Sequence, residues 1–207
     1  MDPVYAYAWH MVVPVEPPAM RSVVQMSDTA ERLSGTFVAD PTHSTFQFSV
    51  KHMGIGIFRG TFDSVDVTTT LGESIGRLHG SARVESISIK NPIAFREHIV
   101  NGADFFDARN HPEITFSSSD VRLGDGASLS MSGNLTIKGV TKPFRAAGSH
   151  SAVIQDLVGQ TRTAVQLTAT IDRRDWGLTW QAQLSNGGDA LGNRVDLSAY
   201  VELIRQP

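Results

Sequence analysis

The chain has 207 residues, of which 41% are hydrophobic and 19% charged, with a formal net charge of -3. These values are typical of one soluble folded domain; they exclude an intrinsically disordered chain and give no reason to expect nucleic acid as a partner. There are no cysteines, which excludes disulfides, thiolate metal sites and cysteine nucleophiles but leaves the cellular compartment open.

The N-terminal region lacks strand periodicity, so we expect residues 1–34 to form a flexible tail ahead of a single domain at 35–207. The opening "MDPVYAYAWHMVVPVEPPAM" has no early Lys or Arg, and prolines break its apolar segment. A secretory signal needs a basic start and an unbroken apolar stretch, and no run approaches the ~20 apolar residues of a membrane-spanning helix. We therefore expect a cytoplasmic protein without stable membrane insertion, and a periplasmic or secreted location is disfavoured.

From Gly35 onward, apolar and polar residues alternate with a period of two, which predicts strands with one apolar and one polar face. Turn signals separate these runs at "LGES", "LGDGA", "IKGVTK" and "SNGGDALGN". Alternating strands joined mostly by short turns predict an all-β fold, either an antiparallel sandwich or a barrel. The apolar positions of the predicted strands are Phe46, Phe48 and Val50; Leu78, Gly80, Ala82 and Val84; Ile114 and Phe116; Leu129, Met131, Gly133, Leu135 and Ile137; Val165, Leu167, Ala169 and Ile171; and Val195, Leu197, Ala199, Val201 and Leu203.

One segment, "NPIAFREHIVNGADFFDARNHP", has apolar residues nearer a helical spacing. Asn91-Pro92 can open a helical turn and Gly102 can close it, while His111-Pro112 favours extended backbone leading into the next strand. We expect one short helical excursion near residues 93–108.

Several positions on the apolar faces hold small residues, namely Gly80, Ala82, Gly133, Ala169 and Ala199. Small inward residues leave volume, and a closed barrel of about eight strands can hold one small ligand. Bulky side chains from facing strands fill such gaps in ordinary cores. A ligand cavity and a filled core are therefore both open interpretations of the pattern.

Four motifs resemble the YceI-like family: "DPTHSTFQFSVKHMGIGIFRGTF", "ADFFDARNHPEITFSSSDV", "GNLTIKGVTKPF" and "IDRRDWGL". They occur in the order typical of the family and span Phe37 to Ile204. The resemblance implies a single lipocalin-like antiparallel β-barrel. Its apolar pore is expected to bind a polyisoprenoid or another long-chain lipid without catalysis. Apart from the resemblance, we expect neither a cofactor nor a metal. The resemblance also implies that such proteins are often dimeric, so a homodimer is among the expected assemblies.

On this basis we predict ligand-binding side chains along the pore wall and at a portal near its mouth. Gly54, Gly56 and Gly60 permit a bend or bulge there, which would bring the apolar residues that follow close to the mouth. The predicted ligand-binding residues are Phe46, Phe48, Val50, His52, Ile55, Ile57, Phe58, Phe105, Phe106, Met131, Leu135, Leu167, Arg173 and Trp176.

The two histidines of the first motif have opposite parity, so His43 and His52 are expected on opposite faces of a strand and not in one metal site. His43 adjoins the turn "DPTHS", where Asp40 favours local hydrogen bonds, and we expect a structural role for it. His52 follows the apolar side, either as a hydrogen-bonded core histidine or as a contact to a ligand head group. Closely spaced zinc-ligand motifs are absent from the sequence.

Arg173 shares the parity of Ile171 and is expected to point inward, where it needs a ligand anion or a carboxylate such as Asp175. Other cations could attract a phosphate head group from loops; these are Arg59, Lys90, Arg96 and Arg109.

The alternative to lipid binding is an enzyme acting on a hydrophobic substrate, with His52 and either Asp104 or Asp107 as an acid–base pair. The sequence contains neither a GxSxG element nor a P-loop, which leaves hydrolase and nucleotide-binding functions without support.

Overall fold

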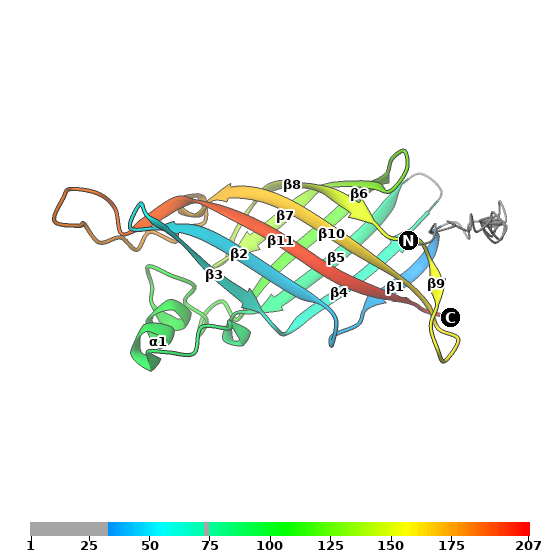
Figure 1. The fold of residues 1–207 in the computed structure, drawn as a ribbon, viewed down its shortest axis with the longest axis horizontal. Coiled ribbons are helices and arrows are strands. Elements are labelled where there is room, and N and C mark those ends of the chain that lie inside the picture. Colours follow the sequence, from blue (N-terminus) through cyan, green and yellow to red (C-terminus); the bar gives the residue numbers. More distant parts are fainter. Residues whose placement is uncertain (1–32, 73–74) are drawn as a thin grey trace, which may run out of the picture. The chain divides into compact units, whose positions relative to one another are not determined.

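In a computed structural model of the protein, residues 33–72 and 75–207 are described, and they form an antiparallel β-barrel (Figure 1). Each barrel strand pairs with the next, and the last pairs back with the first. The eight strands, in order around the barrel, are β1 (Gly35–Ala39), β4 (Val65–Leu71), β5 (Gly76–Arg83), β6 (Glu113–Leu123), β7 (Ser128–Ile137), β8 (Val140–His150), β10 (Thr161–Asp172) and β11 (Leu191–Arg205). The prediction of a single antiparallel β-barrel is confirmed.

The long strand β11 closes the barrel because it pairs along both of its edges. One edge pairs with β10, from Arg162↔Ile204 to Asp172↔Arg194. The other edge pairs first with β2 (Thr45–His52) and then with β1, so that these two strands follow one another beside β11. β3 (Gly56–Phe62) forms a hairpin with β2, and the short β9 (Ile154–Gln155) lies beside β10.

The segment between β5 and β6 covers the free flank of β3. It contains the 3₁₀ turn η1 (Val84–Ser86) and the helix α1 (Ile93–Asn101). The Ser88 amide donates to the Thr61 carbonyl at 2.8 Å, which fastens the segment to β3. The predicted helix is confirmed, but it ends at Asn101, and two turns follow at residues 103–106 and 108–110. Among the described residues, no helix is long and apolar enough to cross a membrane.

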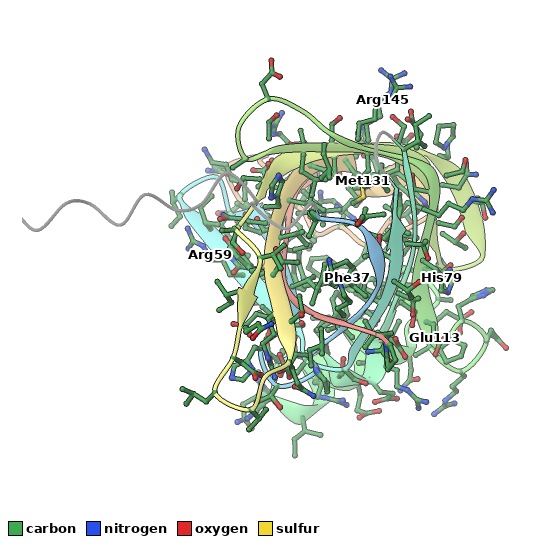
Figure 2. The ribbon with its side chains drawn as sticks, turned by 90° about the vertical axis from the view of Figure 1, so that its right-hand side faces the viewer. Phe37, Arg59, His79, Glu113, Met131 and Arg145 are labelled. Atoms are coloured by element: carbon green, nitrogen blue, oxygen red, sulfur yellow. The ribbon has the colours of Figure 1, made fainter. Side chains whose placement is uncertain are left out.

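Side chains alternate between the barrel interior and the solvent, as the two-residue period predicts. Figure 2 shows Phe37 inside the barrel, whereas Arg59, His79 and Arg145 project outward. Apolar residues form one core cluster inside the barrel around Phe37 and Leu203, and a second cluster beneath α1 that includes Ile99.

Three strands of the closed barrel, β1, β4 and β8, are absent from the predicted strands. In β4, "VDVTTTL", Thr69 occupies an inward position, where it is buried and its hydroxyl donates to the Arg77 carbonyl at 2.8 Å. In β8, Pro143 breaks the strand signal, because proline cannot donate to a strand ladder. The structure accommodates this proline where β8 is unpaired on one side, since β8 meets β10 only from Ala147 to His150.

The predicted tail, residues 1–34, lies outside the described residues apart from its last two positions. The side chain of Leu33 is buried against the barrel core, and the Ser34 carbonyl accepts a hydrogen bond from Arg205 at 3.0 Å.

Candidate functional site

The barrel encloses a cavity of about 400 Å³ whose wall is overwhelmingly apolar. That volume falls within the roughly 300–1,000 Å³ of small-molecule sites. All eight strands of the closed barrel except β1 contribute to the wall, together with β2, β3, α1 and the loop before β11. Of the two interpretations left open by the sequence pattern, the structure therefore supports the cavity. The polar or charged residues in the wall are Gln47, His52, Thr69, Thr115, Thr168, Arg173 and Ser198.

Most residues predicted to bind ligand line this cavity. Three of the predicted residues do not: Ile55, Ile57 and Trp176. Ile55 lies at the β2–β3 turn, and Ile57 occupies an outward position on β3 beside the inward Phe58. Those that line the cavity are Phe46, Phe48, Val50, His52, Phe58, Phe105, Phe106, Met131, Leu135, Leu167 and Arg173.

Trp176 has a packing position instead. It belongs to the 3₁₀ turn η2 (Arg173–Trp176) and is buried in the core cluster of the barrel. Its Nε1 donates to the Leu135 carbonyl at 3.1 Å, close to the stretch where β8 and β10 no longer pair. The side chain therefore closes the wall from outside the cavity.

The small residues predicted to leave volume divide into two groups. Gly80, Ala82, Ala169 and Ala199 line the cavity, whereas Gly133 does not. A Cβ built on Gly133 would lie 2.1 Å from the Ser117 carbonyl oxygen, because β6 is bulged between Ser118 and Asp120. The expectation that Gly133 leaves free volume inside the barrel is therefore wrong.

Sequence reasoning missed several lining residues. The lining residues on β4 and β8 were not identified because those strands were not predicted. The alternation in "VDVTTTL" could have indicated the residues on β4. The helix and the loop before β11 carry too little periodicity to assign a facing side. The missed residues include Val67, Leu71, Phe95, Ile99, Phe144, Ala146 and Trp180.

The two ends of the cavity differ. At the end beside β9, Phe37 is fully buried, and the Arg205 guanidinium lies 5.3 Å from the centre of its ring. At the α1 end, Phe95 lines the cavity and yet is 38% exposed. Residues that line the cavity, Phe95 and His52, are therefore exposed to solvent at the α1 end, which we call the open end.

Aromatic rings form the rim of this open end. The rings of Phe58 and Phe95 meet edge to face with centroids 6.4 Å apart, joining β3 to α1. Phe105 stacks on Trp180 at 5.4 Å. Such rings offer large apolar area with few rotatable bonds, which suits contact with an apolar chain.

Arg173 is the only lysine or arginine in the cavity wall among the described residues, and it is 5% exposed. Its Nε donates to the Gly192 carbonyl at 2.9 Å and its Nη1 to the Leu178 carbonyl at 2.6 Å. Burial lowers the pKa of this guanidinium, because a charge in an apolar wall is poorly solvated.

The carboxylates near Arg173 in sequence bond to other partners. Asp172 accepts hydrogen bonds from Arg174. The expected Arg173–Asp175 pair does not form; Asp175 instead lies 3.9 Å from the Lys142 ammonium. Arg173 therefore brings a positive charge to the open end of the cavity without a hydrogen-bonded carboxylate.

His52 lies at the rim, where it lines the cavity but is exposed. The interpretation of His52 as a hydrogen-bonded core histidine is thus wrong. Within the described residues it makes no ion pair or side-chain hydrogen bond to a carboxylate. An Asp104 carboxylate oxygen instead lies 2.9 Å from His98 Nε2, and Asp107 accepts from Asn110 at 3.0 Å. The acid–base pair of the enzyme alternative is therefore not assembled.

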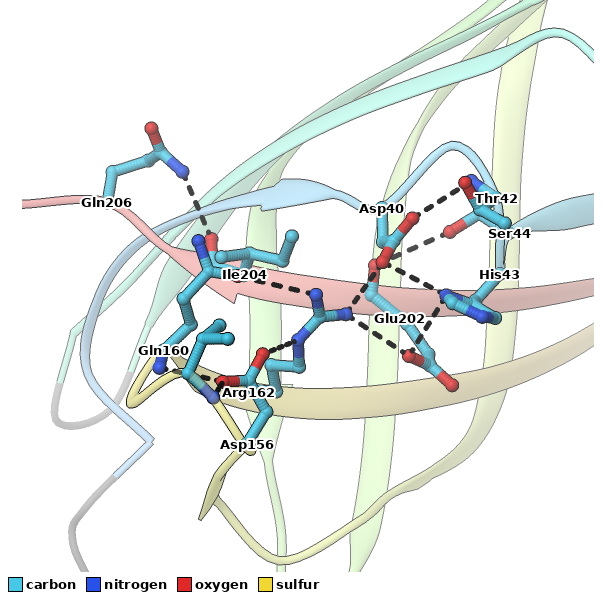
Figure 3. A network of polar contacts seen from close by, with 11 residues as sticks. Asp40, Thr42, His43, Ser44, Asp156, Gln160, Arg162, Glu202, Ile204 and Gln206 are labelled. Atoms are coloured by element: carbon cyan, nitrogen blue, oxygen red, sulfur yellow. Dashed lines mark hydrogen bonds and ion pairs between the residues drawn. The ribbon is translucent and has the colours of Figure 1, made fainter.

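A polar network on the barrel wall, away from the cavity, contains His43 (Figure 3). His43 Nδ1 is 3.0 Å from an Asp40 carboxylate oxygen and 3.7 Å from Glu202. Arg162 lies between the carboxylates: its Nη1 is 2.6 Å from Asp40 and 3.5 Å from Glu202, while its Nε donates to Asp156.

These contacts shift the pKa values of several groups in the network, among them Asp40 and His43. The Arg162 guanidinium holds the pKa of Asp40 well below its usual range, and Asp40 in turn raises the pKa of His43. The Asp40 side chain also accepts from the Thr42 amide at 2.9 Å, so the predicted turn hydrogen bonding is confirmed. The Arg162 guanidinium thus lies among the carboxylates of Asp40, Asp156 and Glu202. Its contacts link the end of β1 to β10 and β11.

Comparison with protein families identifies the barrel. The model of the YceI-like domain matches residues 37–203, which is most of the chain. The chain belongs to the YceI-like family. A UPF0312 protein of Pectobacterium carotovorum is 27% identical over 193 residues, covering 91% of this chain and 96% of the relative. A UPF0312 protein of Staphylococcus aureus is 29% identical over 169 residues, covering 80% of this chain and 95% of the relative.

Solved structures share the YceI-like fold. BcnA of Burkholderia cenocepacia superposes with a TM-score of 0.63 at 20% identity, covering 79% of this chain and 98% of that chain. A domain of Saccharophagus degradans, described as polyisoprenoid binding and implicated in plant cell wall breakdown, gives a TM-score of 0.60 at 14% identity. It covers 82% of this chain and 98% of its own.

Proposed function

We propose that this YceI-like protein binds one long-chain isoprenoid, or a similar amphiphilic lipid, inside its barrel without changing it chemically. The observation that carries this proposal is the apolar cavity that runs through the barrel and has exposed lining residues at the α1 end. The description of the Saccharophagus domain as polyisoprenoid binding supports the same ligand class. Storage, sequestration and transport are all compatible with such binding.

The dimensions of the barrel suit an extended chain. β10 has 12 residues, all within the barrel wall. At a rise of ~3.3 Å per residue and a tilt of ~40°, 12 residues span roughly 30 Å along a barrel axis. An isoprenoid chain offers no hydrogen bonds, so its affinity comes from apolar area removed from water, about 25 cal/mol per Å² before the costs of ordering.

The geometry favours a polar head group at the open end. His52 and the rim aromatics lie at the open end, and the buried Arg173 lines the cavity from η2 at that end, whereas Leu71 and Leu129 line the opposite end. An amphiphile can thus bury its tail and leave its head beside the Arg173 guanidinium. An anionic head would also add to the compensation of the buried charge that Asp172 and Asp189 provide without hydrogen bonds to Arg173.

A non-catalytic role agrees with the separation of His52 from carboxylates described above. A cytoplasmic location and a homodimer remain predictions from the sequence.

Native mass spectrometry of the full chain, purified without detergent, tests the proposal. We expect a co-purifying long-chain amphiphile, or uptake of one added prenol or prenyl phosphate per chain. Failure to bind either an endogenous lipid or an added isoprenoid would refute the proposal. Conversion of a bound prenyl compound that disappears in His52→Ala would instead establish the enzyme alternative.

A further inference from the structure

The barrel exposes apolar side chains from two separate elements at its open end. Ile55, at the β2–β3 turn, is 92% exposed, and Ile93, the first residue of α1, is 70% exposed. Ile57 and Met53 are also exposed beside that turn. In Figure 1 the turn and α1 lie at the same end of the barrel. We refer to Met53, Ile55, Ile57, Ile93 and Phe95 as the portal face.

Basic residues flank the portal face. Lys51 lies directly opposite Ile57 in the β2–β3 register, Arg59 follows two residues later on the outward side of β3, and Lys90 precedes α1. All three are exposed, and the structure gives none of them an ion pair with another described residue.

Acidic groups on the segment between β5 and β6 have partners. Glu85 and Glu97 both contact Arg96, at 3.0 and 3.3 Å, and Asp104 is bound to His98. Arg96, expected from the sequence to be available to a phosphate, is therefore neutralised. Lys51, Arg59 and Lys90 are therefore cations beside the portal face that have no ion-pair partner among the described residues.

The portal face is continuous with the cavity. Phe95 belongs to both, and its ring meets Phe58, which lines the cavity behind it. A lipid that left a bilayer at this face could enter the barrel without exposing its chain to water, which would otherwise oppose transfer.

We propose that the portal face docks onto the surface of an anionic bilayer, and that lipid is exchanged between bilayer and cavity there. Ile55 and Ile93 insert at the boundary between head groups and acyl chains, while Lys51, Arg59 and Lys90 contact anionic head groups. This inference rests on the proposed lipid-binding function. A second copy of the chain fits the face less well, because a two-fold interface would set its unpaired cations against each other.

The loop after β9 provides a matched control. Leu157 and Val158 are also largely or fully exposed, but they lie beside β9 at the other end of the barrel. Their neighbour Asp156 is acidic and bonded to Arg162. This loop matches the portal face in apolar exposure and lacks its unpaired cations, so docking predicts no contribution from it.

Co-sedimentation of the full chain with phosphatidylcholine vesicles, with and without phosphatidylglycerol, tests the proposal. We expect binding that requires phosphatidylglycerol and weakens with salt. Ile55→Asp and Ile93→Asp should each lower the partition coefficient about tenfold. Lys51→Glu should lower it by about fivefold or more, since a cation is removed and an anion is added. Leu157→Asp should leave it unchanged.

Uptake of a soluble short-chain fluorescent prenol, measured without vesicles, separates docking from ligand binding. Wild type, Ile55→Asp and Leu157→Asp should take up the probe equally, and circular dichroism melting should show that all three are folded. Uptake of the probe without vesicle binding would overturn docking and leave the proposed function intact. A loss of vesicle binding in Leu157→Asp as large as that in Ile55→Asp would also overturn docking. So would a wild-type dimer that does not bind vesicles and that Ile55→Asp dissociates.

Discussion

At one end of the barrel, Phe37 and Leu203 are buried and the Arg205 guanidinium lies over the Phe37 ring, whereas at the α1 end Phe95 lines the cavity and reaches solvent. The closed end is built from the strands β1 and β11, with continuous ladders on both sides of β1. The open end is completed by α1, η2 and loops. Ladder hydrogen bonds and fully buried side chains make a region costly to open, while irregular segments leave surface available for a ligand. We therefore expect the closed end to carry stability and the open end to carry binding.

The largest expected effect separates the two ends by stability. Phe37→Ala should lower the free energy of unfolding by about 3–5 kcal/mol, because it removes a fully buried aromatic ring and leaves a cavity. Phe95→Ala, at the exposed rim, should cost roughly 1 kcal/mol or less. Urea unfolding of both variants measures the difference. Equal losses of stability would show that the rim is as tightly packed as the closed end.

The second prediction tests where the ligand enters. Ala169 and Val165 both line the cavity, four residues apart on β10, and Ala169 is the nearer to η2 and the open end. The two positions are roughly 13 Å apart along the strand. Ala169→Phe should lower the affinity for short and long prenols alike, about tenfold or more, because its ring fills the cavity near the mouth. Val165→Phe should lower mainly the affinity for long prenols, since only their chains reach that depth.

Titration calorimetry with prenols of increasing length measures this difference in affinity. A separate comparison of unfolding temperatures contrasts Ala169→Phe with Gly133→Leu. Ala169→Phe places its ring in the cavity, whereas any side chain at Gly133 meets the Ser117 backbone. Gly133→Leu should therefore lower the unfolding temperature much more than Ala169→Phe. If Val165→Phe impaired short prenols more than Ala169→Phe, the ligand would enter from the β9 end.

The third prediction concerns the charge at the open end. Arg173→Gln should lower the affinity for prenyl phosphates by about tenfold relative to the matching prenols, because it removes the cation in the cavity wall. Arg173→Lys retains a positive charge and should keep most of that preference. The ratio of the two affinities is the readout, since a general loss of folding would lower both equally. An unchanged ratio in Arg173→Gln would show that Arg173 has only a structural role, through its hydrogen bonds with Leu178 and Gly192.

The smallest expected effect is the pH dependence of the polar network. Asp40 raises the pKa of His43 in the folded protein above its ordinary value of about 6.5. The stabilisation is therefore fully present below that ordinary value and is lost as the pH rises through the raised pKa. Stability measured by urea unfolding should fall slightly between about pH 6 and pH 9, and His43→Gln should remove this component. The groups facing His43 are Asp40, Glu202 and Arg162.

The alternation of apolar and polar residues was sufficient to predict the barrel wall. In a strand, side chains point to opposite faces in turn, so Phe46, Phe48 and Leu167 could be placed inside without knowledge of their neighbours. Turn residues marked where strands end, as in "LGDGA" between β6 and β7. The helix was also predictable from its local signals, because Pro92 and Gly102 act on their own backbone.

Features that depend on pairing between distant strands were not determined by the sequence pattern. Gly133 has the parity of an inward residue, but a bulge in β6 brings the Ser117 carbonyl against it. Trp176 carries an aromatic side chain suited to the cavity, but η2 places it behind the wall, where it bonds to Leu135. His52 follows three inward residues and yet lies at the rim, because β2 ends there. Alternation specifies the face of a side chain, whereas depth in the barrel and contact across it follow from strand register and closure, which only the tertiary structure decides.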